Sequence, residues 1–122
     1  MAVENKMTPA VARAYLKPYD SWAHRIALLR FIQDIPLTSK DGSWQNLVEI
    51  ENGLKLFQNT PMLILWGGKD FCFTRHFYEE WVQRFPGAEK RFFPDAGHYV
   101  LEDAFDALSP LVTTFFQKHI LQ

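Results

Sequence analysis

The sequence predicts an α/β fold whose sheet is parallel and incomplete. Residues 62–66 (MLILW) form a near-continuous apolar run, which is typical of a strand covered on both faces in a parallel sheet. Residues 89–93 (EKRFF) form a second strand-like run that is more polar at its start, as expected of an edge strand. A helical pattern lies between the two runs and another follows the second. The second half of the chain therefore predicts a β-α-β-α unit.

Three helices are expected before the first strand, over residues 8–16, 21–35 and 43–58. In each range the apolar residues recur at helical spacing. Each range is closed by a proline, because the residue before a proline disfavours the helical conformation. The expected N-caps are Thr8, Ser21 and Ser43.

Two helices are expected after the first strand. Residues 75–85 have one apolar face, follow the N-cap residue Thr74 and end at a Pro-Gly pair. A last helix is expected over residues 103–119. There Pro110 must either kink the helix or mark a restart that Ser109 caps.

The composition is that of a globular domain and excludes several classes of function. The 122 residues suit one domain, and 48% of them are apolar, which is a large apolar load for so small a chain. The net charge is −1 and no basic block occurs, so no nucleic-acid partner is expected. No apolar run approaches about 20 residues, and the polar residues 1–8 do not resemble a signal peptide. We therefore expect a cytoplasmic protein without a membrane span.

Two residues with the chemistry of a catalytic pair follow the predicted strands. Asp70 lies just past residues 62–66, and His98 lies just past residues 89–93. Because neighbouring strands lie about 4.8 Å apart, the two side chains are expected within hydrogen-bond distance. Asp70 would then fix the imidazole tautomer and His98 would act as general base, as two of the three members of a catalytic triad. Taken singly, each residue also has an ordinary structural interpretation, as a turn aspartate and a loop histidine.

The third member of such a triad, the nucleophile, is missing. No Gly-x-Ser-x-Gly elbow occurs anywhere in the 122 residues. The chain is therefore interpreted as the C-terminal part of a hydrolase that carries the base and its acid. The glycines near the pair fit this interpretation: Gly67 and Gly68 would permit a tight turn, and Gly97 would permit unusual dihedral angles before His98.

Other polar residues are assigned structural roles. Cys72 is the single cysteine, which excludes an intramolecular disulfide and a multi-cysteine zinc site. It has no histidine near it in the sequence, so we expect a small apolar residue of the core and not a nucleophile. Asp103 is expected to cap a helix. The remaining histidines have no metal-ligand spacing and are expected on the surface, namely His24, His76 and His119.

Two long segments carry a resemblance to a known family. Residues 60–70 (TPMLILWGGKD) and 95–103 (DAGHYVLED) resemble the end of an α/β-hydrolase, in particular of the haloalkane dehalogenase and epoxide hydrolase branch. Residues 15–25 (YLKPYDSWAHR) and 31–36 (FIQDIP) are similar to the last cap-domain helices of that branch. Within the branch, the third dehalogenase subfamily and the β-lactone decarboxylases of olefin biosynthesis are the most similar.

The resemblance implies a domain organisation and a mechanism. Residues 1–36 would be the terminal part of a helical cap, and residues 37–122 the C-terminal portion of the hydrolase core. A nucleophilic aspartate would attack a carbon of a small-molecule substrate, and His98 would activate the water that hydrolyses the resulting ester. No metal or organic cofactor is implied. The candidate substrate-binding residues are Trp22, Phe31, Phe71 and Tyr99, although packing in the core is the expected role of each.

Three functions remain open at this point. The chain is an incomplete hydrolase that is inactive alone, a non-catalytic interaction module derived from a hydrolase, or a small enzyme completed by oligomerisation. The third ranks lowest, because identical chains cannot supply a nucleophile that none of them contains. For the first two, an unpaired edge of the strand at residues 62–66 and exposed aromatic faces predict self-association as a two-fold dimer.

Overall fold

The computed structural model describes residues 2–5 and 7–119. The chain forms two compact units: residues 8–59 are one, and residues 60–122 together with residues 1–7 are the other. These units are defined by contacts between residues. The predicted boundary at residue 36 is defined differently, by resemblance to the cap and the core of a hydrolase. The division into a cap part and a core part therefore stays a prediction.

The regular elements of the unit of residues 8–59 are all helices. Its elements are α1 (Pro9–Leu16), a 3-10 turn (Lys17–Tyr19), α2 (Trp22–Gln33), α3 (Trp44–Gly53) and a second 3-10 turn (Leu54–Phe57). The predicted N-caps of the first two helices are confirmed, since Thr8 Oγ1 accepts the N–H of Val11 at 3.3 Å and Ser21 Oγ accepts the N–H of His24 at 3.2 Å. Ser43 takes the N-cap position of α3, as predicted, but its side chain makes no capping hydrogen bond. Its hydroxyl donates instead to the carbonyl of Asp34 at 2.6 Å, which ties the start of α3 to the end of α2.

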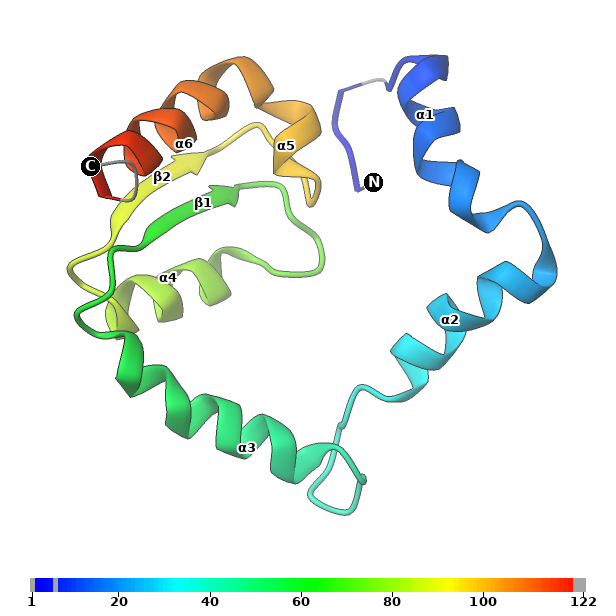
Figure 1. The fold of residues 1–122 in the computed structure, drawn as a ribbon, viewed down its shortest axis with the longest axis horizontal. Coiled ribbons are helices and arrows are strands. Elements are labelled where there is room, and N and C mark those ends of the chain that lie inside the picture. Colours follow the sequence, from blue (N-terminus) through cyan, green and yellow to red (C-terminus); the bar gives the residue numbers. More distant parts are fainter. Residues whose placement is uncertain (1, 6, 120–122) are drawn as a thin grey trace. The chain divides into compact units, whose positions relative to one another are not determined.

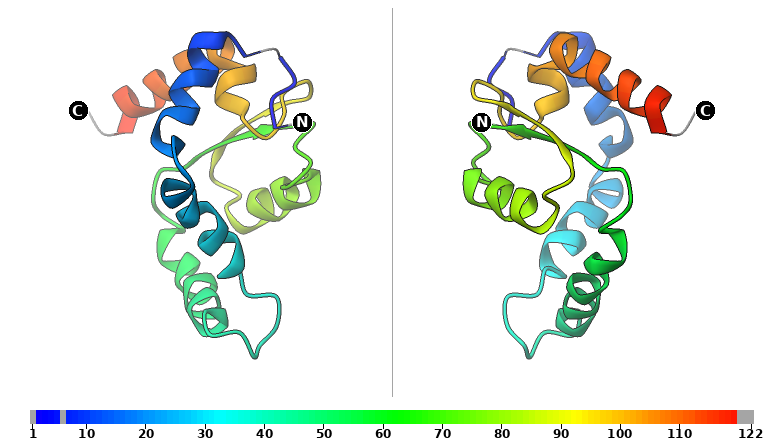
Figure 2. Two further views of the ribbon diagram at one scale, coloured as in Figure 1. Left: turned by 90° about the vertical axis from the view of Figure 1, so that its right-hand side faces the viewer. Right: turned by 90° about the vertical axis from the view of Figure 1, so that its left-hand side faces the viewer.

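The other unit contains the sheet. Strands β1 (Leu63–Gly67) and β2 (Glu89–Phe93) pair in parallel, with Leu63 opposite Glu89 and Gly67 opposite Phe93. Helix α4 (Arg75–Arg84) connects them, and α5 (Val100–Asp103) and α6 (Phe105–His119) follow. Figures 1 and 2 show α4 on one side of the strands and α5 with α6 on the other. The predicted β-α-β-α order and the incomplete parallel sheet are confirmed.

The last helical region differs in detail from the prediction. Helix α6 runs through Pro110 without a break, so a restart capped by Ser109 is wrong. The carbonyl of Ser109 instead accepts the hydroxyl of Thr113 at 3.0 Å. A proline removes one backbone donor from a helix, and here the flanking turns continue in spite of that loss.

The core of the sheet-containing unit is small. Its buried apolar side chains come from β1, the end of α4, the loop after β2 and α6, namely Ile64, Phe85, Ala96 and Leu108. Large apolar side chains stay exposed in both units. This agrees with an apolar load that exceeds what the chain can hide.

Candidate functional site

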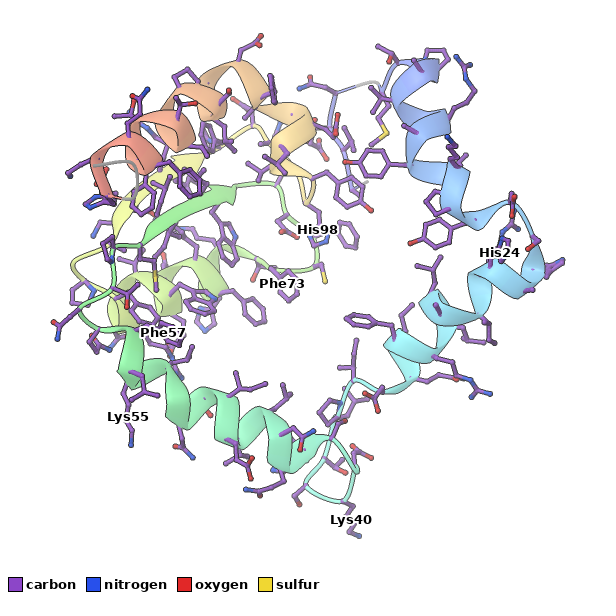
Figure 3. The ribbon with its side chains drawn as sticks, viewed as in Figure 1. His24, Lys40, Lys55, Phe57, Phe73 and His98 are labelled. Carbon is purple, nitrogen blue, oxygen red and sulfur yellow. The ribbon has the colours of Figure 1, made fainter. Side chains whose placement is uncertain are left out.

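The loops that follow the two strands carry the candidate site. They are joined by backbone hydrogen bonds, from the N–H of Gly68 to the carbonyl of Phe93 at 2.7 Å and from the N–H of Lys69 to the carbonyl of Ala96 at 2.9 Å. Figure 3 shows His98 and Phe73 on these loops. The site therefore lies at the carboxyl edge of the parallel sheet, where α/β folds place their functional residues.

Asp70 and His98 form a direct side-chain contact. Nδ1 of His98 lies 2.9 Å from Oδ2 and 3.0 Å from Oδ1 of Asp70. The side chain of Asp70 is 9% exposed and that of His98 is 28% exposed. The predicted proximity is confirmed, and the carboxylate is shielded while the imidazole can be reached from outside.

The local backbone holds the carboxylate in its charged form. Oδ1 of Asp70 accepts the N–H groups of Cys72 and Phe73, each at 2.8 Å. Burial alone raises the pKa of Asp70, but the hydrogen bonds from Phe73, His98 and Cys72 together outweigh burial, so its pKa lies below the ordinary value. Asp70 is consequently a fixed negative charge beside the imidazole.

This arrangement selects one tautomer of His98. Because the carboxylate of Asp70 can only accept, Nδ1 must carry the proton. Nε2 then carries the lone pair and can take a proton from a water or a hydroxyl group. The pair thus has the geometry of a general base oriented by its acid.

Three aromatic rings surround the imidazole. The ring centroids of Phe71, Phe73 and Tyr99 lie 5.8, 5.6 and 5.6 Å from that of His98. Phe71 and Tyr99 are predicted from the sequence, whereas Phe73 is not. The repeat of phenylalanine at positions 71 and 73, directly after the acid, is the signal that could have identified it.

The four predicted substrate-binding residues are divided between the two units, with Phe71 and Tyr99 beside His98 in one of them. Trp22 and Phe31 lie on α2, in the other unit, and are 85% and 78% exposed. Phe71 and Tyr99 are exposed as well. Packing in the core, the expected role of all four, is therefore wrong.

The glycines near the pair have a different role from the predicted one. No glycine among the described residues has a positive φ, so none is required for its dihedral angles. A Cβ at Gly67 would lie 2.1 Å from the carbonyl oxygen of Gly97, and one at Gly68 would lie 2.7 Å from Cα of Pro94. These glycines are therefore required because the two loops approach each other too closely for a side chain.

Two structural assignments made from the sequence are also wrong. Cys72 is exposed, because it lies in the turn that bonds Asp70 and not on an inward-facing element. Asp103 does not cap a helix. Its carboxylate accepts the backbone N–H groups of Glu4 and Asn5, which are distant in the sequence, and that of Gly97, which lies in the loop before α5.

The remaining histidines lie on helices and not on the two loops of the candidate pair. His24 and His76 are exposed on α2 and α4. His119 is half-buried at the end of α6, where its Nε2 and Nζ of Lys118 lie 3.1 and 2.8 Å from Oε1 of Glu89. Residues 2–5 and 7–119 contain no group of three or more His, Cys, Asp or Glu that could hold a metal ion.

Comparison with known proteins identifies the family of the chain. Residues 3–105 match the family described as the alpha/beta hydrolase fold, and the chain belongs to that family. It is 41% identical over 121 residues to a cis-3-alkyl-4-alkyloxetan-2-one decarboxylase of Xanthomonas campestris pv. campestris, covering 99% of this chain and 40% of the relative. It is 45% identical over 112 residues to a protein of the same description from Shewanella oneidensis, covering 92% of this chain and 35% of the relative. The chain thus spans about two-fifths of the length of these relatives.

None of the helices in its described part combines the length and the apolar character that a membrane crossing requires.

Proposed function

We propose that this chain supplies the acid and the general base of a catalytic triad to a hydrolase-fold enzyme that acts on a small dialkyl β-lactone. The observation that carries the proposal is the contact of 2.9 Å between Nδ1 of His98 and the shielded carboxylate of Asp70. The substrate class is that of the relatives from Xanthomonas campestris and Shewanella oneidensis, whose names describe decarboxylation of a cis-3-alkyl-4-alkyloxetan-2-one.

The proposed division of labour follows from the residues present. The 122 residues contain no Gly-x-Ser-x-Gly elbow, so in this proposal the nucleophile comes from a segment outside them and the chain alone is inactive. By the resemblance to the dehalogenase and epoxide hydrolase branch, that nucleophile is an aspartate. In the proposal it attacks the alkyl-bearing ring carbon that carries the ring oxygen and forms an ester, while the bond from that carbon to the ring oxygen breaks and the lactone carboxyl group is released as a carboxylate. Nε2 of His98 then takes the proton of the water that attacks the ester, and Asp70 stabilises the imidazolium.

The rings around His98 support an apolar substrate. Phe71, Phe73 and Tyr99 lie within 6 Å of the imidazole, measured between ring centroids, and offer alkyl groups a surface beside the base. In the proposal, these rings contact the alkyl substituents of the lactone, and neither a metal nor an organic cofactor takes part.

A chimera tests the proposal directly. This chain replaces the matched 40% of the Xanthomonas campestris relative, and the chimera and the isolated chain are assayed with a cis-3,4-dialkyloxetan-2-one, an activated ester, an epoxide and a 1-bromoalkane. We expect turnover of the lactone by the chimera, none by the isolated chain, and loss of turnover in His98→Ala. His76→Ala, which removes an exposed histidine on α4, is the matched control and should retain activity.

Two results would reject the proposal. Robust turnover by the isolated chain would show that no outside nucleophile is needed. A folded chimera in which His98→Ala retains full activity would show that this histidine is not the base.

A second candidate function is a self-associating interaction module. It is favoured by the edge of β1, since β1 pairs with β2 alone among the described strands. In this second proposal a copy of the chain covers the edge of β1, and the protein acts through binding. Its proposed location is the cytoplasm.

A further inference from the structure

The backbone on both sides of His98 is hydrogen-bonded to one region, which consists of Asp103 and the first residues of the chain. On one side, the N–H of Gly97 donates to Oδ2 of Asp103 at 2.7 Å. On the other side, the N–H of Tyr99 donates to the carbonyl of Ala2 at 2.8 Å. Figure 1 shows the N-terminal segment beside α5, where Asp103 lies. The peptide groups that flank the imidazole are thus both held by this one region.

Asp103 links the N-terminal segment to the loop of His98. Its carboxylate accepts the N–H of Glu4 at 3.0 Å and that of Asn5 at 2.7 Å, in addition to that of Gly97. The side-chain amide of Asn5 donates back to the carbonyl of Asp103 at 3.0 Å. We call Asp103 and residues 2–5, with these bonds, the clamp.

The charge of Asp103 suits this role. Burial raises its pKa, but the bonds from Glu4, Asn5 and Gly97, together with the charge of Lys69, outweigh burial, so the pKa lies below its ordinary value. A charged acceptor makes stronger hydrogen bonds to backbone donors than a neutral one does. The clamp is therefore formed at neutral pH.

The packing around Gly97 is an independent sign that the clamp is close-fitting. A Cβ at Gly97 would lie 2.9 Å from the carbonyl oxygen of Ala2 and 3.2 Å from Oδ2 of Asp103. Gly97 itself is buried. Any side chain at this position would push the clamp away from the loop of His98.

We propose that Asp103 is a positioning residue that, with residues 2–5, holds the backbone of His98 so that its imidazole faces Asp70. The inference deepens the proposed function, on which its catalytic consequence rests. Asp70 fixes which nitrogen of the ring is protonated, and the clamp fixes where the ring stands. Small displacements of a base from its working position cost about 10²-fold in rate.

A graded series of variants tests the clamp in the isolated full chain. Asn5→Ala removes the amide bond, Asn5→Pro removes that bond and a backbone donor, and Asp103→Ala removes the shared acceptor. Asp103→Asn restores one acceptor oxygen. The readout is the imidazole of His98 in proton–nitrogen NMR spectra. Two-bond correlations report the tautomer, and the one-bond correlation reports the Nδ1–H resonance. We expect this resonance to weaken progressively along the series and to recover in part in Asp103→Asn.

The matched control is Asp41→Ala. Asp41 also accepts two backbone N–H groups, those of Leu37 and Thr38 at 2.8 and 2.7 Å, but it lies in the other unit. It should lose stability without changing the signals of His98. If Asp103→Ala does not fold, Asn5→Pro and Gly97→Ala still test the clamp, because they disturb it while the carboxylate stays in place.

The activity readout uses the chimera described above. Asn5→Pro and Asp103→Ala should lower kcat by about 10²-fold with little change in KM. Unchanged His98 spectra in Asn5→Pro, Gly97→Ala and Asp103→Ala would overturn the clamp, whatever the activity. Altered spectra with an inactive parent chimera would leave the clamp standing and count against the proposed function alone.

Discussion

The backbone N–H of Phe73 donates to Oδ1 of Asp70 at 2.8 Å, and this bond joins the acid of the candidate pair to one of the three aromatic residues around His98. The ring of the same residue lies 5.6 Å from the imidazole of His98. The indole N–H of Trp66 in turn donates to the carbonyl of Phe73 at 2.9 Å, which anchors the loop to β1. One residue therefore orders the carboxylate through its backbone and contacts the base through its side chain.

Phe73→Ala separates these two roles, because the backbone donor remains while the ring is lost. We expect the KM of the chimera for a dialkyl lactone to rise about tenfold, as the loss of an apolar pocket contact would produce. The kcat should change less, since Asp70 keeps its hydrogen bonds. Phe116→Ala is the matched control: its ring on α6 is 45% exposed against 46% for Phe73, so its loss of stability should be similar and its KM unchanged. Equal effects of both variants on KM would contradict the role of Phe73.

Acid should remove a stabilising contribution from Asp70. Its pKa in the folded chain lies below the ordinary value of 3.8, so the charged form is favoured by folding. That contribution is present above the ordinary value and is lost as the pH falls through the folded value. The difference in the free energy of unfolding between the wild type and Asp70→Asn should therefore shrink below about pH 4, as measured by urea denaturation.

Asp95→Asn is the control for this pH series. Asp95 forms an exposed pair with Lys69 at 3.2 Å, and exposed pairs contribute less than about 1 kcal/mol. A difference between the wild type and Asp70→Asn that stayed constant down to about pH 2 would show that the hydrogen bonds to Asp70 do not favour its charged form.

Alanine should have opposite effects on stability at Gly67, where two loops approach closely, and at Gly53, where the space is open. Gly67→Ala should lower the free energy of unfolding by about 3 kcal/mol or more, because its Cβ would meet the carbonyl oxygen of Gly97 at 2.1 Å. Gly53→Ala should raise it by about 0.5–1 kcal/mol, because Gly53 ends α3 with φ −73° and nothing lies within 4 Å of the new atom. Chemical denaturation measures both. A tolerated alanine at position 67 would mean that the loops do not approach as closely as described.

We propose that a second copy of the chain covers the edge of β1, and light scattering after size-exclusion chromatography tests this. A dimer is expected at micromolar concentration, since an unpaired apolar strand recruits another. Leu63→Lys places a charge on β1 and should shift the chain towards monomer. Leu56→Lys, at an exposed position of the second 3-10 turn, should not. A wild-type chain that runs as a well-behaved monomer would exclude this mode of association.

Local patterns in the sequence were sufficient to predict the elements and the pair. The apolar runs and the prolines and glycines that bound them predicted β1 within one residue and β2 over residues 89–93. The position of Asp70 and His98 after neighbouring strands predicted their contact, because parallel strands end at the same edge of the sheet. The caps at Thr8 and Ser21 were also predictable, because a capping side chain bonds a backbone N–H only two or three positions away.

By itself the sequence determined which groups stand at the end of which strand, because periodicity and capping act over a few residues. Only the tertiary structure decided that Asp103 bonds Glu4 and Asn5, which lie 99 and 98 residues away, and that Phe73 turns its ring towards His98. It also decided that Gly67 and Gly97 are required by contact and not by dihedral angle. Such contacts depend on where the folded backbone brings distant loops together, and no spacing along the chain encodes that distance.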